Sequence, residues 1–217
     1  MGDAVSQTFR CMYPEGRGGR APRGIPELTS PAATGIPQVT AVTFCRGSHW
    51  YVSLRVGAHT SAPFEVPDDP PIPPFVTVQS FVTLRGGSTP AVLVEREEFG
   101  SVAIYELFTS TRARVTPVPL VPGQSPVLLL KASSTLDGAG FTCTPSASGE
   151  VIRQYSWYII NPLTMRTTAQ GSILGDPEVY LETTVYTAVS PQTFTSTTDP
   201  IIPTGYTTVK GFDGDSC

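Results

Sequence analysis

Hydrophobic and polar residues alternate along several segments of the chain with a period of two, which is typical of half-buried β-strands. The clearest example is residues 178–189, where Val179, Leu181, Val185 and Val189 fall on one face. No segment shows the period of 3.6 residues that indicates an amphipathic helix. The pattern therefore predicts strands and hardly any helix. We expect strands at 38–45, 50–56, 75–84, 91–96, 100–110, 112–118, 127–132, 141–143, 150–160, 178–189, 194–197 and 206–210.

Breaks in the alternation predict the segments between these strands. Residues 63–74 are rich in proline and predict a semi-rigid crossing between two strands. Residues 133–149 predict a loop, apart from the short strand at 141–143. The charge cluster at 95–98 predicts a short helix or a hairpin loop. We expect residues 1–37 to be extended or partly disordered and residues 38–217 to form a single β-rich domain.

The composition agrees with many short strands joined by many turns. The 217 residues include 22 Pro and 20 Gly, which punctuate turns, together with much Thr and Val, which suit strands. The predicted fold class is all-β: an antiparallel β-barrel or β-sandwich with many short strands, long loops and little helix.

The net charge and the content of charged residues disfavour some classes of function. The net charge is −4 and charged residues make up 15% of the chain. An acidic chain is a poor general nucleic-acid binder. The glycine-interleaved Arg10, Arg17, Arg20 and Arg23 could touch RNA phosphates, but a linker is the better interpretation. No apolar run approaches the length of a membrane span, so we expect no membrane insertion.

The four cysteines, Cys11, Cys45, Cys143 and Cys217, are widely spaced and include no Cys-x-x-Cys pair. We expect four free thiols in a reducing compartment, with one bridge left open as the alternative. The only Asn is Asn161, which Pro162 follows, so the chain has no N-glycosylation sequon. This favours a protein that folds in the cytosol.

Candidate catalytic residues are few. His49 and His59 are the only imidazoles, and no Gly-x-Ser-x-Gly motif accompanies them. The end of the chain, Gly-Asp-Ser-Cys at 214–217, is similar to the loop around a chymotrypsin-type nucleophile, but no further strands follow. Cys45 and His49 lack the second ligand pair of a zinc site. We therefore expect no enzyme, no cofactor and no bound metal.

Polar and aromatic residues gather beside one turn. Arg46, Ser48, His49, Trp50 and Tyr51 are the candidate binding residues, because carbohydrate sites set an aromatic face against a sugar ring and add polar contacts. The alternative for Trp50, and for Trp157 in another aromatic strand, is a place in the core.

The size, the Thr/Val/Pro/Gly-rich composition and the opening run Gln-Thr-Phe-Arg-Cys-Met-Tyr at 7–13 resemble the spike, or projection, domain of astrovirus capsid proteins, the avian ones included. The resemblance implies a homodimeric spike on the virion surface, made in the host cytoplasm. It also implies attachment to a host-cell receptor, with carbohydrate as one ligand class, exposure to antibodies, and a connection to the rest of the capsid protein. It supplies no catalytic residues.

The expected function is therefore host-cell attachment by a viral surface domain. The alternatives are a hydrolase of viral or phage origin on a β scaffold, and a cell-surface adhesin domain.

Overall fold

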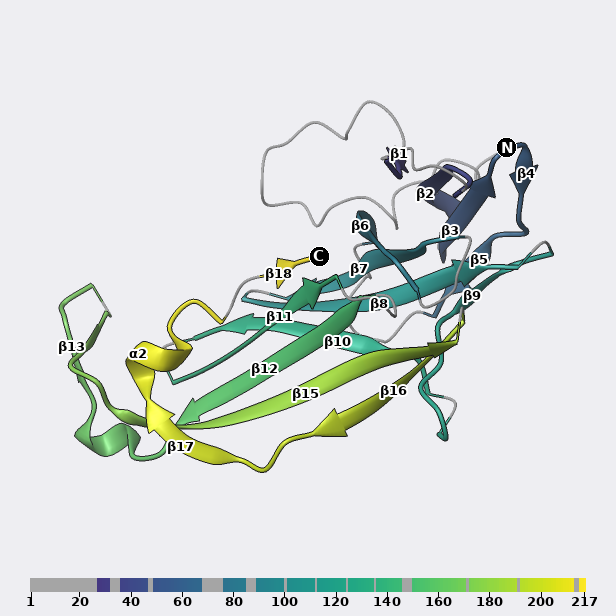
Figure 1. Ribbon diagram of the computed structural model, residues 1–217. Helices are drawn as coiled ribbons and strands as arrows, with labels where there is room; N and C mark the ends of the chain where they lie inside the picture. Colours follow the sequence, from purple (N-terminus) through teal and green to yellow (C-terminus); the bar gives the residue numbers. More distant parts are fainter. Residues whose placement is uncertain are drawn as a thin grey trace, which may run out of the picture.

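The computed structural model describes residues 27–31, 36–46, 49–67, 76–84, 89–99, 101–111, 113–123, 125–134, 136–145, 150–170, 172–190, 192–212 and 215–217 (Figure 1). About 67% of these residues are in strands and about 4% are in helices. The prediction of an all-β chain with little helix is confirmed. The large antiparallel sheets do not close into a barrel, so of the two predicted architectures the closed barrel is not formed.

A small sheet contains five strands in the order β1-β2-β3-β4, with β5 also paired to β3. Its central hairpin joins two eight-residue strands, and the strand β1 lies inside the predicted N-terminal segment 1–37. Residues 1–26 of that segment lie outside the described residues. The strands are β1 (Glu27–Thr29), β2 (Val39–Arg46), β3 (His49–Val56), β4 (His59–Thr60) and β5 (Phe64–Val66).

A large sheet of eleven strands follows the order β16-β15-β12-β11-β10-β8-β7-β6, and β17, β18 and β9 pair at its sides. Every pair in it is antiparallel except β11 with β18, which is parallel. Its strands are β6 (Thr77–Val82), β7 (Ala91–Phe99), β8 (Val102–Ser110), β9 (Val115–Pro117), β10 (Leu128–Ser133), β11 (Asp137–Thr144), β12 (Val151–Ile159), β15 (Glu178–Ser190), β16 (Thr193–Thr198), β17 (Ile202–Gly205) and β18 (Asp215–Ser216).

The large sheet curls over its own core. One buried cluster combines Leu93 and Leu107 from one half of the sheet with Phe141, Ile152 and Phe194 from the other half. The ring of Tyr105 meets that of Phe141 edge-on, at a centroid distance of 5.0 Å. The two halves of the sheet therefore share one core, and Figure 1 shows β7 and β8 on one side of β10, β11 and β12, with β15 and β16 on the other side.

Two further clusters complete the core. The small sheet packs on the outer side of β6, β7 and β8, where Val52 and Leu54 meet Val92 and Phe108. At the opposite end of the molecule, Trp157 and Val179 pack with Val209. The segments around this last cluster are η1 (Pro162–Thr164), β13 (Arg166–Thr167), β14 (Ile173–Leu174) and the short helix α2 (Tyr206–Val209).

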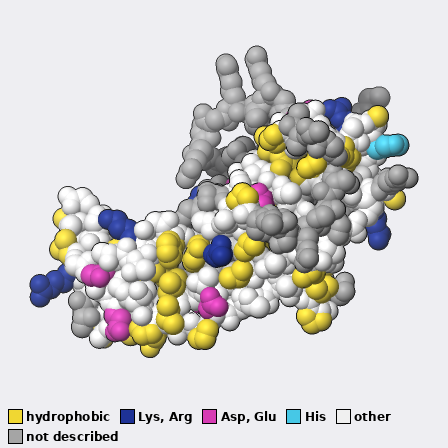
Figure 2. Space-filling view, viewed as in Figure 1, with side chains coloured by type: hydrophobic (Ala, Val, Ile, Leu, Met, Phe, Trp, Pro, Cys, Tyr) yellow, Lys and Arg dark blue, Asp and Glu magenta, His cyan; other side chains and the backbone are white. Residues whose placement is uncertain are grey.

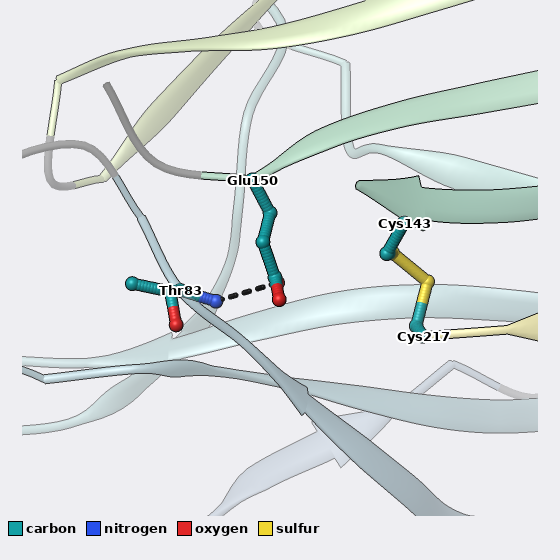
Figure 3. The surroundings of a disulfide bond; sticks show 4 residues. All are labelled: Thr83, Cys143, Glu150 and Cys217. Carbon is teal, nitrogen blue, oxygen red and sulfur yellow. Dashed lines mark hydrogen bonds between the residues drawn. A yellow bond between two sulfur atoms is a disulfide. The ribbon is translucent and has the colours of Figure 1, made fainter. Parts of the chain in front are cut away.

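The expectation of four free thiols is wrong for two of them, because Cys143 and Cys217 form a disulfide (Figure 3). The strand β18 pairs with β11 and brings the two Cα atoms to 4.6 Å, although 74 residues separate them in sequence. Beside this bond, the amide of Thr83 donates to Oε2 of Glu150 at 2.8 Å, and the amide of Glu150 donates to the carbonyl of Thr83 at 2.9 Å. These bonds tie the end of β6 to the start of β12.

Four local predictions are also wrong. Residues 95–98 continue β7, because Arg96 forms a β-bulge that keeps the strand paired with β8. Residues 137–144 form a full strand, β11, where mostly loop was expected. Residues 206–209 form the helix α2 and not a strand. The expected break at 63–74 contains β5 at its start, while residues 68–74 lie outside the described residues.

Candidate functional site

The predicted binding residues lie at one end of the β2–β3 hairpin. The ladder places Arg46 opposite His49 and Phe44 opposite Tyr51. On the other side of β3, Tyr51 lies opposite Glu65 of β5. Because directly paired residues of an antiparallel sheet project to the same face, Phe44, Arg46, His49, Tyr51 and Glu65 share one face of the small sheet. We call these five residues the outer-face cluster.

Alternation along the strand separates Trp50 from this cluster. Trp50 projects to the opposite face and packs, partly buried, against the core between the two sheets. Trp157 is also a core residue and is only 5% exposed. The structure thus bears out the core interpretation of both tryptophans. Ser48, the remaining candidate, lies outside the described residues.

The outer-face cluster is organised around one carboxylate. The hydroxyl of Tyr51 donates to Oε2 of Glu65 at 2.9 Å, and Nδ1 of His49 lies 3.2 Å from Oε1 of the same group. Each oxygen of Glu65 therefore has its own partner. The side chains of His49 and Glu65 remain 46% and 53% exposed, so the network is open to solvent.

The aromatic part of the cluster is a stacked pair. The rings of Phe44 and Tyr51 lie 5.4 Å apart, with an angle of 16° between their planes. The hydrogen bond to Glu65 raises the pKa of Tyr51 above its usual value, and desolvation and the negative charge of Glu65 act in the same direction. The phenol therefore stays protonated at neutral pH and remains a donor to the carboxylate.

The same face continues as a polar surface along the small sheet. Nη2 of Arg55 lies 3.7 Å from Oε1 of Glu27 and donates to Oγ1 of Thr40 at 3.4 Å. Oγ1 of Thr29 lies 3.3 Å from Oγ1 of Thr40. The outer-face cluster is thus the aromatic end of a sheet face that carries several polar side chains.

The other candidate catalytic residues lie far apart in the structure. His59 pairs with Val56 at one end of β3, while His49 begins the strand at the other end. A separation of seven residues along a strand corresponds to roughly 23 Å. Ser216 lies on β18 in the large sheet. The structure therefore does not bring the two histidines together, and each occupies an exposed strand position.

The part of the chain that the structure describes contains neither a metal-binding group nor a membrane-spanning helix. There, no three His, Cys, Asp or Glu side chains gather as a metal-binding group. No helix among these residues is long and apolar enough to span a membrane.

Comparisons with protein-family models, with curated proteins and with solved structures find no match to this chain.

Sequence reasoning missed two members of the cluster, Phe44 and Glu65. Phe44 was assigned to a strand, but its partner across the ladder depends on the register of the hairpin. Glu65 falls in the proline-rich segment that was expected to be a crossing. The signal that could have found it is the alternation of Phe64, Glu65 and Val66, in which only Val66 is fully buried.

Proposed function

We propose that this chain is a binding domain on the surface of a small virus capsid and that the outer-face cluster attaches it to a host-cell receptor. The observation that carries the proposal is the exposed Tyr51–Glu65–His49 network beside the ring of Phe44 and the guanidinium of Arg46. It joins an apolar ring surface, a cation and a carboxylate on one solvent-facing sheet.

A carbohydrate is the ligand class that this combination suits best. The rings offer a surface for the C–H face of a sugar. The carboxylate of Glu65 accepts from sugar hydroxyls, and Arg46 donates to hydroxyl or carboxylate groups. Since His49 and Glu65 of the cluster are exposed on a sheet face, the cluster suits the end of a glycan chain displayed on a cell.

The position of the cluster agrees with attachment. The outer-face cluster belongs to the small sheet, which lies at one end of the molecule in the view of Figures 1 and 2. The hydrophobic band near α2 and β17 lies toward the other end in the same view. The proposal includes a two-fold homodimer joined to the rest of the capsid protein, with its outer surface facing antibodies on the virion.

The test is a glycan array with the purified chain, followed by flow cytometry on susceptible cells. We expect binding that Tyr51→Ala and Arg46→Ala each weaken at least roughly tenfold, as residues central to an interface do. Tyr51→Phe keeps the stacked ring and loses only the hydroxyl, so it should weaken binding less.

Arg166→Ala is the matched control for Arg46→Ala, because Arg166 is also an exposed arginine but lies on β13 in another part of the molecule. Circular dichroism checks that every variant is folded. The proposal is wrong if the folded chain binds neither glycans nor cells, or if it binds and the Arg46 and Tyr51 variants bind as well as the parent.

A further inference from the structure

A row of four side chains crosses the large sheet far from the outer-face cluster. The ladders place Asp137 opposite Tyr158, Tyr158 opposite Tyr180, and Tyr180 opposite Pro203, across β11, β12, β15 and β17. Directly paired residues of antiparallel strands project to the same side. The rings of Tyr158 and Tyr180 lie 5.2 Å apart at an interplanar angle of 53°. The tyrosines therefore form one aromatic platform.

This platform is open to solvent. Tyr158 is 48% exposed, and Tyr180 is half-buried. The apolar neighbours Trp157 and Val179 project to the opposite face, where they pack with Val209. Two neighbouring rings left in contact with water are more typical of a binding surface than of a solvated sheet face.

Carboxylates surround the platform. Glu178 and Glu182 lie two residues before and after Tyr180 on the same face of β15, and Asp137 stands beside Tyr158. The four strands contain a single basic residue, Arg153, whose odd position in β12 places it on the opposite face. The π faces and the three carboxylates thus create one electrostatic preference, which is for a cation.

We propose that the Tyr158–Tyr180 platform is a docking surface for a basic, extended peptide segment of a partner protein. An arginine of that segment stacks on the more exposed ring, that of Tyr158, and contacts the inclined ring of Tyr180, because its planar guanidinium binds aromatic faces and carboxylates together. Glu178, Glu182 and Asp137 supply the opposite charge. Charge complementarity favours this partner over an anionic lipid surface, which the carboxylates repel, and over a neutral glycan, which leaves them unmatched.

The test measures binding of a fluorescein-labelled peptide of alternating arginine and serine to the intact chain by fluorescence anisotropy. A peptide with citrulline in place of arginine keeps the shape and removes the charge. We expect the arginine peptide to bind and the citrulline peptide to bind at least roughly tenfold more weakly. Binding should weaken as salt is added, because the carboxylates are exposed.

Variants locate the site. Tyr158→Ala combined with Tyr180→Ala should weaken the arginine peptide roughly tenfold, and Glu182→Gln should weaken it roughly threefold. Glu27→Gln removes the same charge from the small sheet and should change nothing. The proposal is overturned if the citrulline peptide binds equally well, if the double variant binds like the parent, or if Glu27→Gln and Glu182→Gln have the same effect. This inference does not rest on the proposed receptor-binding function, since it uses a different surface and ligand.

Discussion

Gly138 lies directly opposite Trp157 in the β11–β12 ladder, and the indole occupies the space in which a side chain at position 138 would begin. A Cβ atom at Gly138 would lie 2.6 Å from Cε2 and from Nε1 of Trp157. Both residues are buried, and Trp157 also packs edge-on against Tyr206 of α2. The missing side chain of Gly138 therefore lets the indole lie flat on β11 and support α2.

Gly138→Ala should lower the free energy of unfolding by roughly 1–3 kcal/mol, because the indole must move out of a packed cluster. Urea unfolding followed by tryptophan fluorescence measures this. Gly123→Ala is the control, since its Cβ would meet only Oγ of Ser125 at 3.6 Å. An equal effect of the two substitutions would show that the contact with Trp157 is not the cause.

Much of this architecture follows from periodicity alone, and β15 shows why. Its alternation survives in the first part of the strand, with Val179 and Leu181 buried and Glu178 exposed, because a strand with one covered face must alternate. Near the end of the strand the prediction for Val189 is wrong: Ala188 is buried and Val189 is exposed, where the register with β16 shifts. The candidate site is predicted less completely. Tyr51, His49 and Arg46 share a face as their spacing predicts, but Glu65 joins them only through the pairing of β5 with β3.

The wrong predictions concern residues whose structure depends on distant partners. A run of charges such as 95–98 has low strand propensity, yet β7 continues through it because the segment pairs with β8 on both sides of the bulge at Arg96. Cysteine spacing says nothing of the pairing between β18 and β11. A local sequence pattern cannot predict a contact between residues that lie 74 positions apart in the chain.

The Cys143–Cys217 disulfide should stabilise the fold by closing a long loop. Replacing both cysteines with serine should lower the free energy of unfolding by roughly 2–4 kcal/mol, because the unfolded chain regains the freedom that the cross-link removes. Urea unfolding of the double variant and the parent measures the difference. Mass spectrometry after alkylation without a reductant checks that the parent carries the bond. Equal midpoints for the two proteins would contradict a stabilising role.

The hydrogen bond from Tyr51 to Glu65 should be visible in the titration of the phenol. Because this bond raises the pKa of Tyr51, Glu65→Gln should lower that pKa toward its usual value near 10.0. Near-ultraviolet absorbance measures tyrosine ionisation, and subtracting the curve of Tyr51→Phe isolates this residue among the 8 tyrosines. Glu27→Gln, which removes a carboxylate elsewhere on the small sheet, should leave the titration unchanged. A Tyr51 pKa that is the same with and without Glu65 would show that the bond does not form in solution.

Glu106 of β8 is a buried carboxyl group between the two sheets. Its side chain is 3% exposed, and Nη1 of Arg96 lies 3.5 Å from Oε2. Burial raises the pKa of Glu106 from 4.5 to about 7, and the charge of Arg96 opposes this only in part. The folded protein therefore holds a proton on Glu106 at pH values where the unfolded chain has already released it.

The free energy of unfolding should fall as the pH rises from about 4.5 to about 7, since the folded state binds more protons than the unfolded state across this window. The stabilisation from Glu106 is complete at pH values below its unfolded-state pKa and is lost at pH values above its folded-state pKa, and the full change in the free energy of unfolding is roughly 3 kcal/mol.

Glu106→Gln has no proton to lose, so the free energy of unfolding of this variant should depend less on pH over the same range. The quantity to compare is the slope of the free energy of unfolding, measured with urea, against pH. The free energy at a single pH is not suitable, because the variant also removes the carboxylate partner of Arg96 and is destabilised for that reason. Glu150, whose pKa burial also raises, is present in both proteins, and its contribution cancels in the difference. Parallel slopes for the parent and Glu106→Gln would show that Glu106 does not titrate in this window.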